Sequence, residues 1–258
     1  MNTFRLCVLV IATLFIGRTA FSQGKTLNYS DGDAKLQGYY VKAKSQKAKS
    51  PGVVIIHQWM GLSGHEKTSA DKLAALGYNA LAADIYGAGN IPKNTAEAGE
   101  KAGYYKTNYQ VYQSRIKSAI EQLIKQGTDP NRIVVMGYCF GGTGALEAAR
   151  AGLPVKGVVS IHGGLGKDAK RSNSPIKTSV LILHGADDPY SPKAEVDQVT
   201  AELKEAKADF QVILYSNAVH AFTQVEAGND NSKGAAYNEA AAKRSWGHLK
   251  LFLEEMFK

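Results

Sequence analysis

The sequence predicts an α/β fold in which a mostly parallel central sheet is covered by helices on both faces. Two observations support this prediction. Short apolar, β-branched runs alternate along the chain with longer stretches that have helical periodicity. Several of these runs are also apolar at every position, as strands are when helices cover both faces of the sheet. No internal repeat or linker divides the 258 residues, so most of the chain is expected to form one domain.

The predicted strands are apolar runs bounded by turn-forming residues. The first alternates polar and apolar residues, which is typical of an antiparallel strand at an edge of the sheet. The second follows Pro51-Gly52, and the third follows Gly77, which is placed to end a helix. The seven strands are expected at residues 36–41, 53–57, 80–85, 133–136, 155–161, 180–183 and 210–215.

Helices are predicted between and after these strands. The clearest covers residues 109–124, where apolar side chains recur at helical spacing before Gly127 and Pro130 end the pattern. Residues 92–104 are polar and rich in alanine, and they predict a short helix and a loop over the sheet. The helices are expected at residues 66–76, 92–104, 109–124, 144–151, 194–207 and 235–257.

The first 22 residues predict a secretory signal peptide. Residues 1–5 carry a positive charge, residues 6–16 are apolar, and Ala20 and Ser22 are small residues at the positions that precede cleavage. The apolar run is too short to span a membrane comfortably, so no stable membrane anchor is expected after cleavage. Residues 23–258 would then form a single secreted or periplasmic domain.

Removal of this segment leaves one cysteine, Cys139, and lowers the formal net charge from +8 to +6. A lone thiol cannot form an internal disulfide, and in an exported protein it carries a risk of oxidation. This favours a reactive role for Cys139. The excess lysines are densest at residues 42–49, and no aromatic residues are interleaved with them on one face. Nucleic-acid binding is therefore not expected.

Cys139 lies where a buried strand turns sharply into a helix. Residues 137–142 read Gly-Tyr-Cys-Phe-Gly-Gly. A nucleophile on such an elbow needs glycines two residues before and two residues after it, because Cβ atoms there would collide with the crossing backbone. The alternative is a buried core cysteine in an ordinary strand-to-helix turn, since cysteines are among the most buried residues.

Two more candidates follow the ends of later strands, and in a parallel sheet functional residues lie just beyond the carboxyl ends of the strands. Asp188 follows the sixth predicted strand and His220 the seventh. Together with Cys139 they give the order nucleophile, acid, histidine, which is the order of the α/β-hydrolase triad. Asp188 is preferred to Asp187 for its spacing from Gly185. Either aspartate could instead be a turn cap.

From about residue 27 to residue 257 the chain resembles the dienelactone hydrolase family of α/β-hydrolases. The most specific feature is the tyrosine before a cysteine in the elbow. Similar segments are Asp-Ile-Tyr-Gly at residues 84–87, the spacing from Gly185 to Asp188, and His220 followed by Phe222. The resemblance implies an α/β-hydrolase fold with Cys139 as the nucleophile, His220 as the base and Asp188 as the acid.

The chemistry of these side chains agrees with such roles. A cysteine at a helix N-terminus beside an imidazole has a lowered pKa, so the attacking thiolate is available. His220 would hold the proton and later activate water, while Asp188 orients the ring. The backbone N–H groups of Phe140 and Trp59 would form the oxyanion hole. These roles predict cleavage of a small ester or lactone through a thioester acyl-enzyme, without a cofactor.

The chain also departs from the family pattern. Where the family has a glutamate after the second predicted strand, this chain has Gln58, which cannot take a proton but could accept a hydrogen bond from the thiol. The arginines that bind the substrate carboxylate in the family are missing. Only Arg171 lies in a loop on the catalytic side of the sheet. Neutral esters are therefore expected to be better substrates than carboxylated ones.

Tyr86 and Tyr138 are further candidates for binding a substrate oxygen, although buried tyrosines usually find a partner within the protein. No metal site is expected, because no paired ligand spacing links the remaining histidines, which are His57, His65, His162, His184 and His248. Two other functions stay open at this stage. One is an acyltransferase on the same triad, and the other is a non-catalytic binding protein on a hydrolase scaffold.

Overall fold

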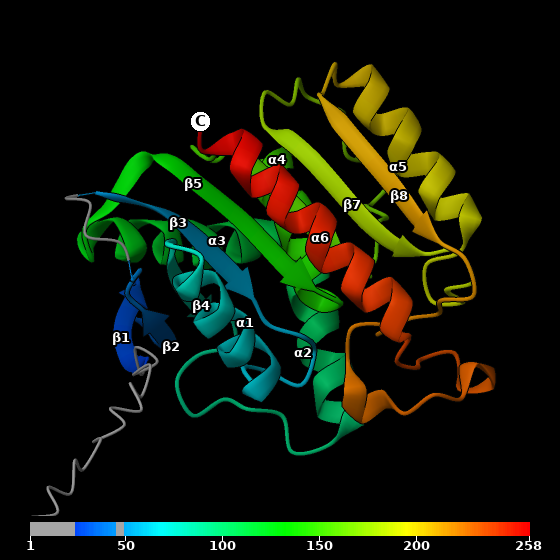
Figure 1. Ribbon diagram of the computed structural model, residues 1–258, viewed down its shortest axis with the longest axis horizontal. Coiled ribbons are helices and arrows are strands. Elements are labelled where there is room, and N and C mark those ends of the chain that lie inside the picture. Colours follow the sequence, from blue (N-terminus) through cyan, green and yellow to red (C-terminus); the bar gives the residue numbers. More distant parts are fainter. Residues whose placement is uncertain (1–23, 45–48) are drawn as a thin grey trace, which may run out of the picture.

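The computed structural model describes residues 24–44 and 49–258, and the expected signal peptide lies outside these residues. The described strands form one sheet in the order β1-β2-β4-β3-β5-β6-β7-β8. The strands from β3 to β8 are parallel, while β2 pairs antiparallel with both β4 and β1. Helices lie on both faces of the sheet (Figure 1). The predicted α/β-hydrolase architecture is confirmed.

All seven predicted strands are present, with ends shifted by a few residues. The strands are β1 Lys25–Asp31, β2 Ala34–Val41, β3 Ser50–Ile56, β4 Asn79–Ala83, β5 Thr128–Tyr138, β6 Gly157–Ile161, β7 Ser179–Gly185 and β8 Phe210–Tyr215. The helices are α1 Gly64–Ala75, α2 Thr95–Thr107, α3 Tyr109–Lys125, α4 Phe140–Arg150, α5 Lys193–Glu205 and α6 Glu239–Met256, and short 3-10 turns lie at Val225–Ala227 and Asn231–Lys233.

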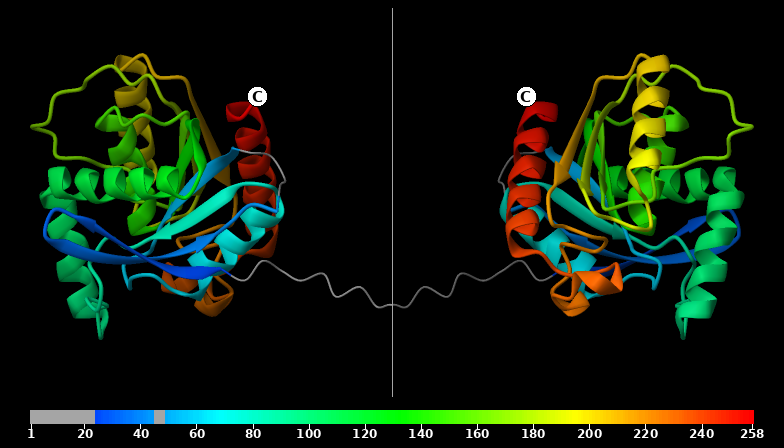
Figure 2. Two further views of the ribbon diagram at one scale, coloured as in Figure 1. Left: turned by 90° about the vertical axis from the view of Figure 1, so that its left-hand side faces the viewer. Right: turned by 90° about the vertical axis from the view of Figure 1, so that its right-hand side faces the viewer.

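Two apolar layers enclose the sheet. Figure 2 gives two further views of the helices around it. Side chains from α2, α3, α4 and α5 pack on one face, and side chains from α1 and α6 pack on the other. Every residue of β3 is buried, which explains its uninterrupted apolar sequence. Burial on both faces holds the central strands in register, so their carboxyl ends are fixed relative to one another.

The antiparallel edge differs from the prediction in one respect. The edge strand is β1, which was not predicted, and β2 is the second strand of the sheet. The polar residues of β1 are mostly exposed or half-buried, so its sequence lacks an apolar run. Asp31 pairs with Ala34 across a two-residue turn whose Gly32 has a φ of 56°. A glycine suits this left-handed conformation, and Gly32-Asp33 between two strands is itself a hairpin signal.

Helix α4 also begins earlier than predicted. The expected start was residue 144, after the glycines that mark the tight turn, and glycines are poor helix formers. In the structure the helix starts at Phe140, directly after Cys139. All residues of its first two turns are buried. Close packing against the sheet therefore outweighs the low helix propensity of the glycines, and Cys139 becomes the residue that caps the helix.

Candidate active site

Cys139 occupies a sharp turn between β5 and α4. Its backbone has a φ of 54° and a ψ of −115°, a conformation that non-glycine residues rarely adopt. The flanking glycines make the turn possible. A Cβ on Gly137 would lie 2.1 Å from the carbonyl oxygen of Gly141, and a Cβ on Gly141 would lie 2.2 Å from that of Ile56. The glycine spacing thus matches the steric requirement of an elbow.

The surroundings of Cys139 favour its thiolate. Burial raises the pKa of the thiol, but a hydrogen bond and the charge of His220 lower it, and so does the backbone N–H of Phe140. The charge of Lys106 acts in the same direction, and the resulting pKa lies below the usual value for a thiol. Cys139 is also only partly buried. A thiol that is both ionisable and accessible can react, unlike a core cysteine.

His220 and Asp188 form the second half of the site. Nδ1 of His220 lies 2.9 Å from Oδ2 of Asp188. The other carboxylate oxygen accepts hydrogen bonds from the backbone N–H groups of Tyr190, at 2.9 Å, and Ser191, at 3.3 Å. Asp188 therefore caps its own turn and also orients the imidazole. Asp187, by contrast, is exposed.

The imidazole of His220 is held in its protonated form. Burial lowers its pKa, but hydrogen bonds to Asp188 and to the Cys139 thiol, together with their charges, raise the pKa to about 10. Since the thiol pKa is lowered by the same contact, a thiolate–imidazolium pair is the favoured resting state. Nδ1 faces Asp188, which leaves Nε2 to serve the sulfur.

The two backbone positions expected to bind an oxyanion are each held by a tyrosine hydroxyl. Tyr112 donates a hydrogen bond to the carbonyl oxygen of Phe140 at 2.9 Å, and their rings are stacked with centroids 4.6 Å apart. Tyr86 donates to the carbonyl oxygen of Trp59 at 2.9 Å. Both segments therefore keep one fixed conformation, as preorganised donors require.

Gln58 has a partner that the sequence analysis missed. Its Nε2 lies 3.1 Å from Oε1 of Glu66, a fully buried carboxylate in the first turn of α1. The other oxygen of Glu66 accepts from the backbone N–H and the hydroxyl of Ser63, at 2.9 and 2.7 Å. A capping box, Ser-x-x-Glu, was the sequence signal for this glutamate.

The remaining sequence candidates have their polar atoms engaged within the protein. The hydroxyl of Tyr86 bonds to Trp59, as described above, and the hydroxyl of Tyr138 lies 3.0 Å from that of Ser69. The guanidinium of Arg171 makes two bonds of 2.9 Å to Glu147 and lies over the ring of Tyr109. Arg171 is therefore already paired with a carboxylate of the protein.

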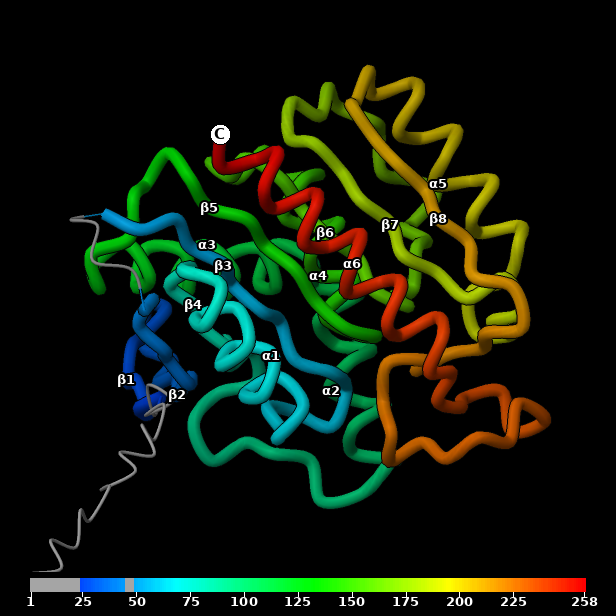
Figure 3. Tube along the Cα trace, viewed as in Figure 1, coloured from blue at the N-terminus to red at the C-terminus, as the bar shows by residue number. Residues whose placement is uncertain are grey.

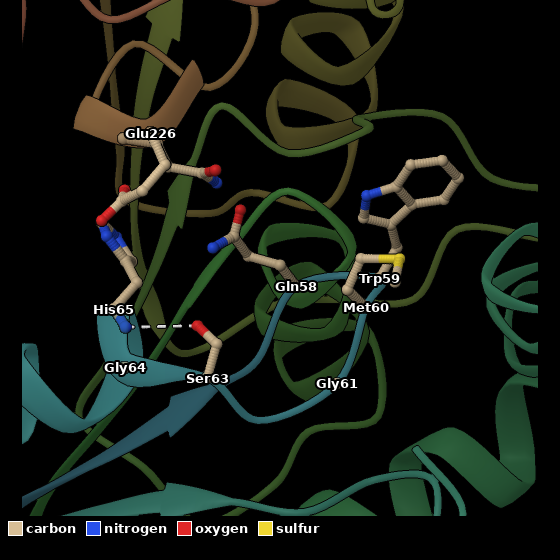
Figure 4. A pocket seen from close by; sticks show the side chains of 9 residues that line it. Gln58, Trp59, Met60, Gly61, Ser63, Gly64, His65 and Glu226 are labelled. Atoms are coloured by element: carbon tan, nitrogen blue, oxygen red, sulfur yellow. Dashed lines mark hydrogen bonds between the residues drawn. The ribbon is translucent and has the colours of Figure 1, made fainter. Parts of the chain in front are cut away.

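A cavity of about 330 Å³ lies between the loop after β3 and the loop after β8. Figure 3 shows the chain between β8 and α6 passing near the start of α1. In Figure 4, Gln58 projects between His65 and Glu226 on one side and Trp59 and Met60 on the other. The loop that contributes Gln58 and Trp59 follows β3 directly, and the β3 backbone at Ile56 abuts α4 at Gly141. The cavity therefore lies beyond the carboxyl end of β3, which pairs with β5, and its lining residues include none of Cys139, Asp188 and His220.

Neither a metal centre nor a membrane span is found in residues 24–44 and 49–258. No group of three or more His, Cys, Asp or Glu side chains there is arranged to hold a metal ion. No helix in the same part of the chain is long and apolar enough to cross a membrane.

A mostly parallel sheet with this elbow defines an α/β-hydrolase. More particularly, the chain belongs to the dienelactone hydrolase family, whose sequence profile matches residues 36–257. It is accordingly a hydrolase of carboxylic esters or lactones.

Relatives with known names or structures agree. A putative carboxymethylenebutenolidase of Salmonella typhimurium is 27% identical over 89% of this chain and 86% of its own length. A protein of the same name from Saccharolobus solfataricus is 27% identical over 91% of this chain and 99% of its own length. The crystal structure of a dienelactone hydrolase-like promiscuous phosphotriesterase from metagenomic libraries is 33% identical, with a TM-score of 0.85 over 91% of this chain and 98% of that one.

Proposed function

We propose that this protein cleaves small esters or lactones through a covalent thioester on Cys139, with His220 as the base and Asp188 as the acid. The observation that carries the proposal is the contact from the Asp188 carboxylate through the His220 imidazole to the Cys139 thiol. The relatives named carboxymethylenebutenolidase support a lactone or ester as substrate.

In the first half of the reaction the Cys139 thiolate attacks the carbonyl carbon of the substrate. The carbonyl oxygen becomes an oxyanion, which accepts hydrogen bonds from the N–H groups of Phe140 and Trp59. When the C–O bond to the alcohol breaks, the imidazolium of His220 gives its proton to the leaving oxygen. The acyl group is then bound to sulfur as a thioester. With a lactone, the alcohol stays attached to the same acyl chain.

In the second half, neutral His220 takes a proton from water, and the resulting hydroxide attacks the thioester carbonyl. The C–S bond breaks, the carboxylic acid leaves, and the thiolate–imidazolium pair is restored. Asp188 stabilises the positive imidazolium whenever it forms. Every proton transfer is thus carried by His220, which is consistent with a glutamine at position 58.

The direct test uses an activated ester with the native chain and its Cys139→Ala variant. The native chain is expected to gain the mass of one acyl group during turnover. Without the nucleophile, kcat/KM should fall by about 10³ or more, because only the oxyanion hole remains. Rapid alkylation by iodoacetamide should also be confined to Cys139. Near-normal turnover in the Cys139→Ala variant would refute the role of the thiol.

We also propose that the chain is exported to the periplasm or the medium and is cleaved after Ser22. The support is the charged, apolar and small-residue pattern of residues 1–22. Expression in an exporting host should give a mature protein that starts at Gln23, as measured by intact mass. A soluble extracellular product that keeps residues 1–22 would contradict this proposal.

A further inference from the structure

The cavity beyond the carboxyl end of β3 has one apolar wall and one polar wall. Trp59 and Met60 form the apolar wall, and each is 37% exposed. Gln58, His65 and Glu226 form the polar wall, and Figure 4 shows their side chains gathered opposite the indole. The catalytic roles proposed above use only the backbone of Trp59. The side chains of both walls are therefore available to a substrate.

The orientation of the Gln58 amide is set by its neighbour. A carboxylate can only accept hydrogen bonds, so the amide must direct its NH₂ group towards Glu66. Oε1 of Gln58 is then the atom that a ligand in the cavity can reach. Because Glu66 is fully buried, the orientation is shielded from solvent. Gln58 thus presents an acceptor to the cavity.

The N-terminus of α1 also borders the cavity, and an open helix N-terminus would favour an anion. Here the chain itself supplies the acceptors. The Ser63 side chain accepts hydrogen bonds from the backbone N–H groups of His65 and Glu66. The Glu66 carboxylate in turn accepts a hydrogen bond from the backbone N–H of Ser63. The negative charge of Glu66 also lies in the first turn. The N–H groups at the start of α1 therefore already have acceptors within the chain, and this helix end does not favour an anion in the cavity.

The net charge of the cavity comes from Glu226. Burial lowers the pKa of His65 and outweighs the charges of Glu66 and Glu226, which raise the pKa, so the neutral imidazole is favoured. Of the described residues that line the cavity, Glu226 is then the only one with a formal charge. The indole N–H of Trp59 and the amide of Gln224 are neutral. The cavity combines a carboxylate, an amide oxygen and an aromatic ring.

The geometry points to this cavity as a subsite for a substrate group that donates hydrogen bonds, with an ammonium group preferred to a hydroxyl. An ammonium can pair with Glu226, donate to Oε1 of Gln58, and lie against the face of an indole. A carboxylate there would be repelled by Glu226 and would face the acceptor oxygen of Gln58. This assignment rests on the proposed ester hydrolysis for its catalytic consequence, but not for the binding itself.

The catalytic test is a matched set of 4-nitrophenyl esters of phenylacetic acid, with a para aminomethyl, hydroxymethyl, ethyl or carboxymethyl group. The rigid ring prevents the chain end from attacking its own ester. We expect kcat/KM to fall in the order ammonium, hydroxyl, ethyl, carboxylate, with ammonium about fivefold above ethyl for a partly exposed ion pair. A second set, para-substituted benzyl acetates, places the same groups on the alcohol side. The order is expected in at least one set.

The Glu226→Gln variant removes the charge and keeps the shape. It should bring the ammonium-to-ethyl ratio of kcat/KM close to one, through a loss with the ammonium ester. The matched control is Glu255→Gln, which neutralises another exposed glutamate in the last turn of α6, and it should leave the ratio unchanged. Equal rates for the ammonium and ethyl esters in both sets, or a ratio that Glu226→Gln does not alter, would overturn the assignment.

Direct binding separates this inference from the proposed catalytic function. Benzylammonium, benzyl alcohol and phenylacetate are titrated into the native chain by calorimetry. Benzylammonium is expected to bind about fivefold more tightly than benzyl alcohol, and Glu226→Gln should remove this difference. Such binding without ester hydrolysis would support the subsite and refute the proposed function. Tighter binding of phenylacetate would overturn the subsite, whatever the enzyme hydrolyses.

Discussion

Helix α4 carries ionisable groups at both ends, and the two ends differ in the kind of charge they hold. At its N-terminus the Cys139 thiol meets the His220 imidazole, and one proton distinguishes the charged pair from the neutral pair. Towards its C-terminus Glu147 accepts from Arg150 at 3.0 Å and from Arg171 at 2.9 Å. Arg150 also binds Glu202 with two bonds of 2.8 Å.

The difference shows how one helix separates chemistry from structure. A guanidinium is never deprotonated in a protein, so the cluster of Glu147, Arg150 and Arg171 cannot move protons. Burial raises the pKa of Glu147, but the arginines outweigh it and the pKa lies below its usual value. Permanent charges thus fix the end of the helix remote from the elbow, while groups that can exchange a proton lie at the elbow.

The largest effect is expected from Asp188→Asn, which acts on the proton-exchanging groups at the N-terminus of α4. The asparagine oxygen can still accept the backbone bonds of Tyr190 and Ser191, so the turn should persist. It cannot stabilise an imidazolium or hold the same tautomer of His220. We expect kcat/KM for an activated ester to fall by about 10³ with little change in thermal unfolding.

Asp187→Asn is the matched control, since Asp187 is the exposed neighbour. It should keep normal kcat/KM. If both variants were fully active, Asp188 would be a turn cap only. If Asp187→Asn alone lost activity, the acid would have been assigned to the wrong carboxylate.

At the Glu147 cluster, towards the C-terminus of α4, we expect a loss of stability without a loss of activity. The side chain of Glu147 is only 4% exposed, and Glu147→Ala would leave the buried guanidinium of Arg150 and the partly buried guanidinium of Arg171 without this partner. Breaking a buried ion pair costs about 3 kcal/mol. The free energy of unfolding in urea should fall by about this amount, with kcat/KM per folded molecule unchanged.

The exposed pair of Lys117 and Glu121, 3.8 Å apart, provides the control. Glu121→Ala should change the free energy of unfolding by no more than about 0.5 kcal/mol. A large loss of kcat/KM in folded Glu147→Ala protein would mean that the two ends of α4 are not independent.

The same comparison explains what the sequence can and cannot predict. The elbow is predictable because its glycines are required by contacts with the backbone, as at Gly137 and Gly141. The order of nucleophile, acid and histidine is likewise a property of the chain. By contrast, Arg171 was considered as a substrate ligand because its loop lies on the catalytic side. Its pairing with Glu147 depends on side-chain packing between a loop and a helix, which no local pattern encodes.

Two other omissions have different causes. Strand β1 was missed because its side chains are polar and mostly not buried, so it lacks the periodicity by which strands were recognised. The Gly32-Asp33 turn signal was available. The Glu66 contact of Gln58 joins a loop to a helix eight residues away. The capping box predicts that Glu66 faces Ser63, but not that it also orients an amide beside the active site.

The pH dependence of Cys139 alkylation tests whether His220 controls the ionisation of the thiol. Because the contact with His220 lowers the thiol pKa, alkylation in the native chain should begin at a lower pH than it does for an ordinary thiol. The rate with iodoacetamide should be nearly level until the imidazolium loses its proton near the raised pKa of about 10. In His220→Ala, burial still raises the thiol pKa, and only the Phe140 N–H and the charge of Lys106 oppose it. The rate at pH 7 should then fall about tenfold, and it should rise steadily with pH.

Equal pH profiles for the native chain and His220→Ala would show that His220 does not control the thiol. The thiolate would then depend mainly on the N-terminus of α4 and the Phe140 N–H.

The smallest effect is expected from Lys106, in the last turn of α2. Its Nζ lies 3.5 Å from the place where a Cβ on Gly164 would be, and its charge contributes to the lowered pKa of Cys139. Lys106 is exposed, however, so solvent and salt screen this charge. Lys106→Gln should slow alkylation of Cys139 at pH 7 by about twofold at low ionic strength. The difference should disappear at about 0.5 M salt.

Lys125→Gln provides the control, because Lys125 is an exposed lysine in the last turn of α3. It should leave the alkylation rate unchanged at either salt concentration. A tenfold or salt-independent loss in Lys106→Gln would mean that the ammonium touches the reacting atoms instead of acting at a distance. Lys106 would then be a cation within reach of a substrate carboxylate, a role that the arginines at the other end of α4 do not fill. Carboxylated esters should in that case lose more of their kcat/KM in Lys106→Gln than neutral esters do.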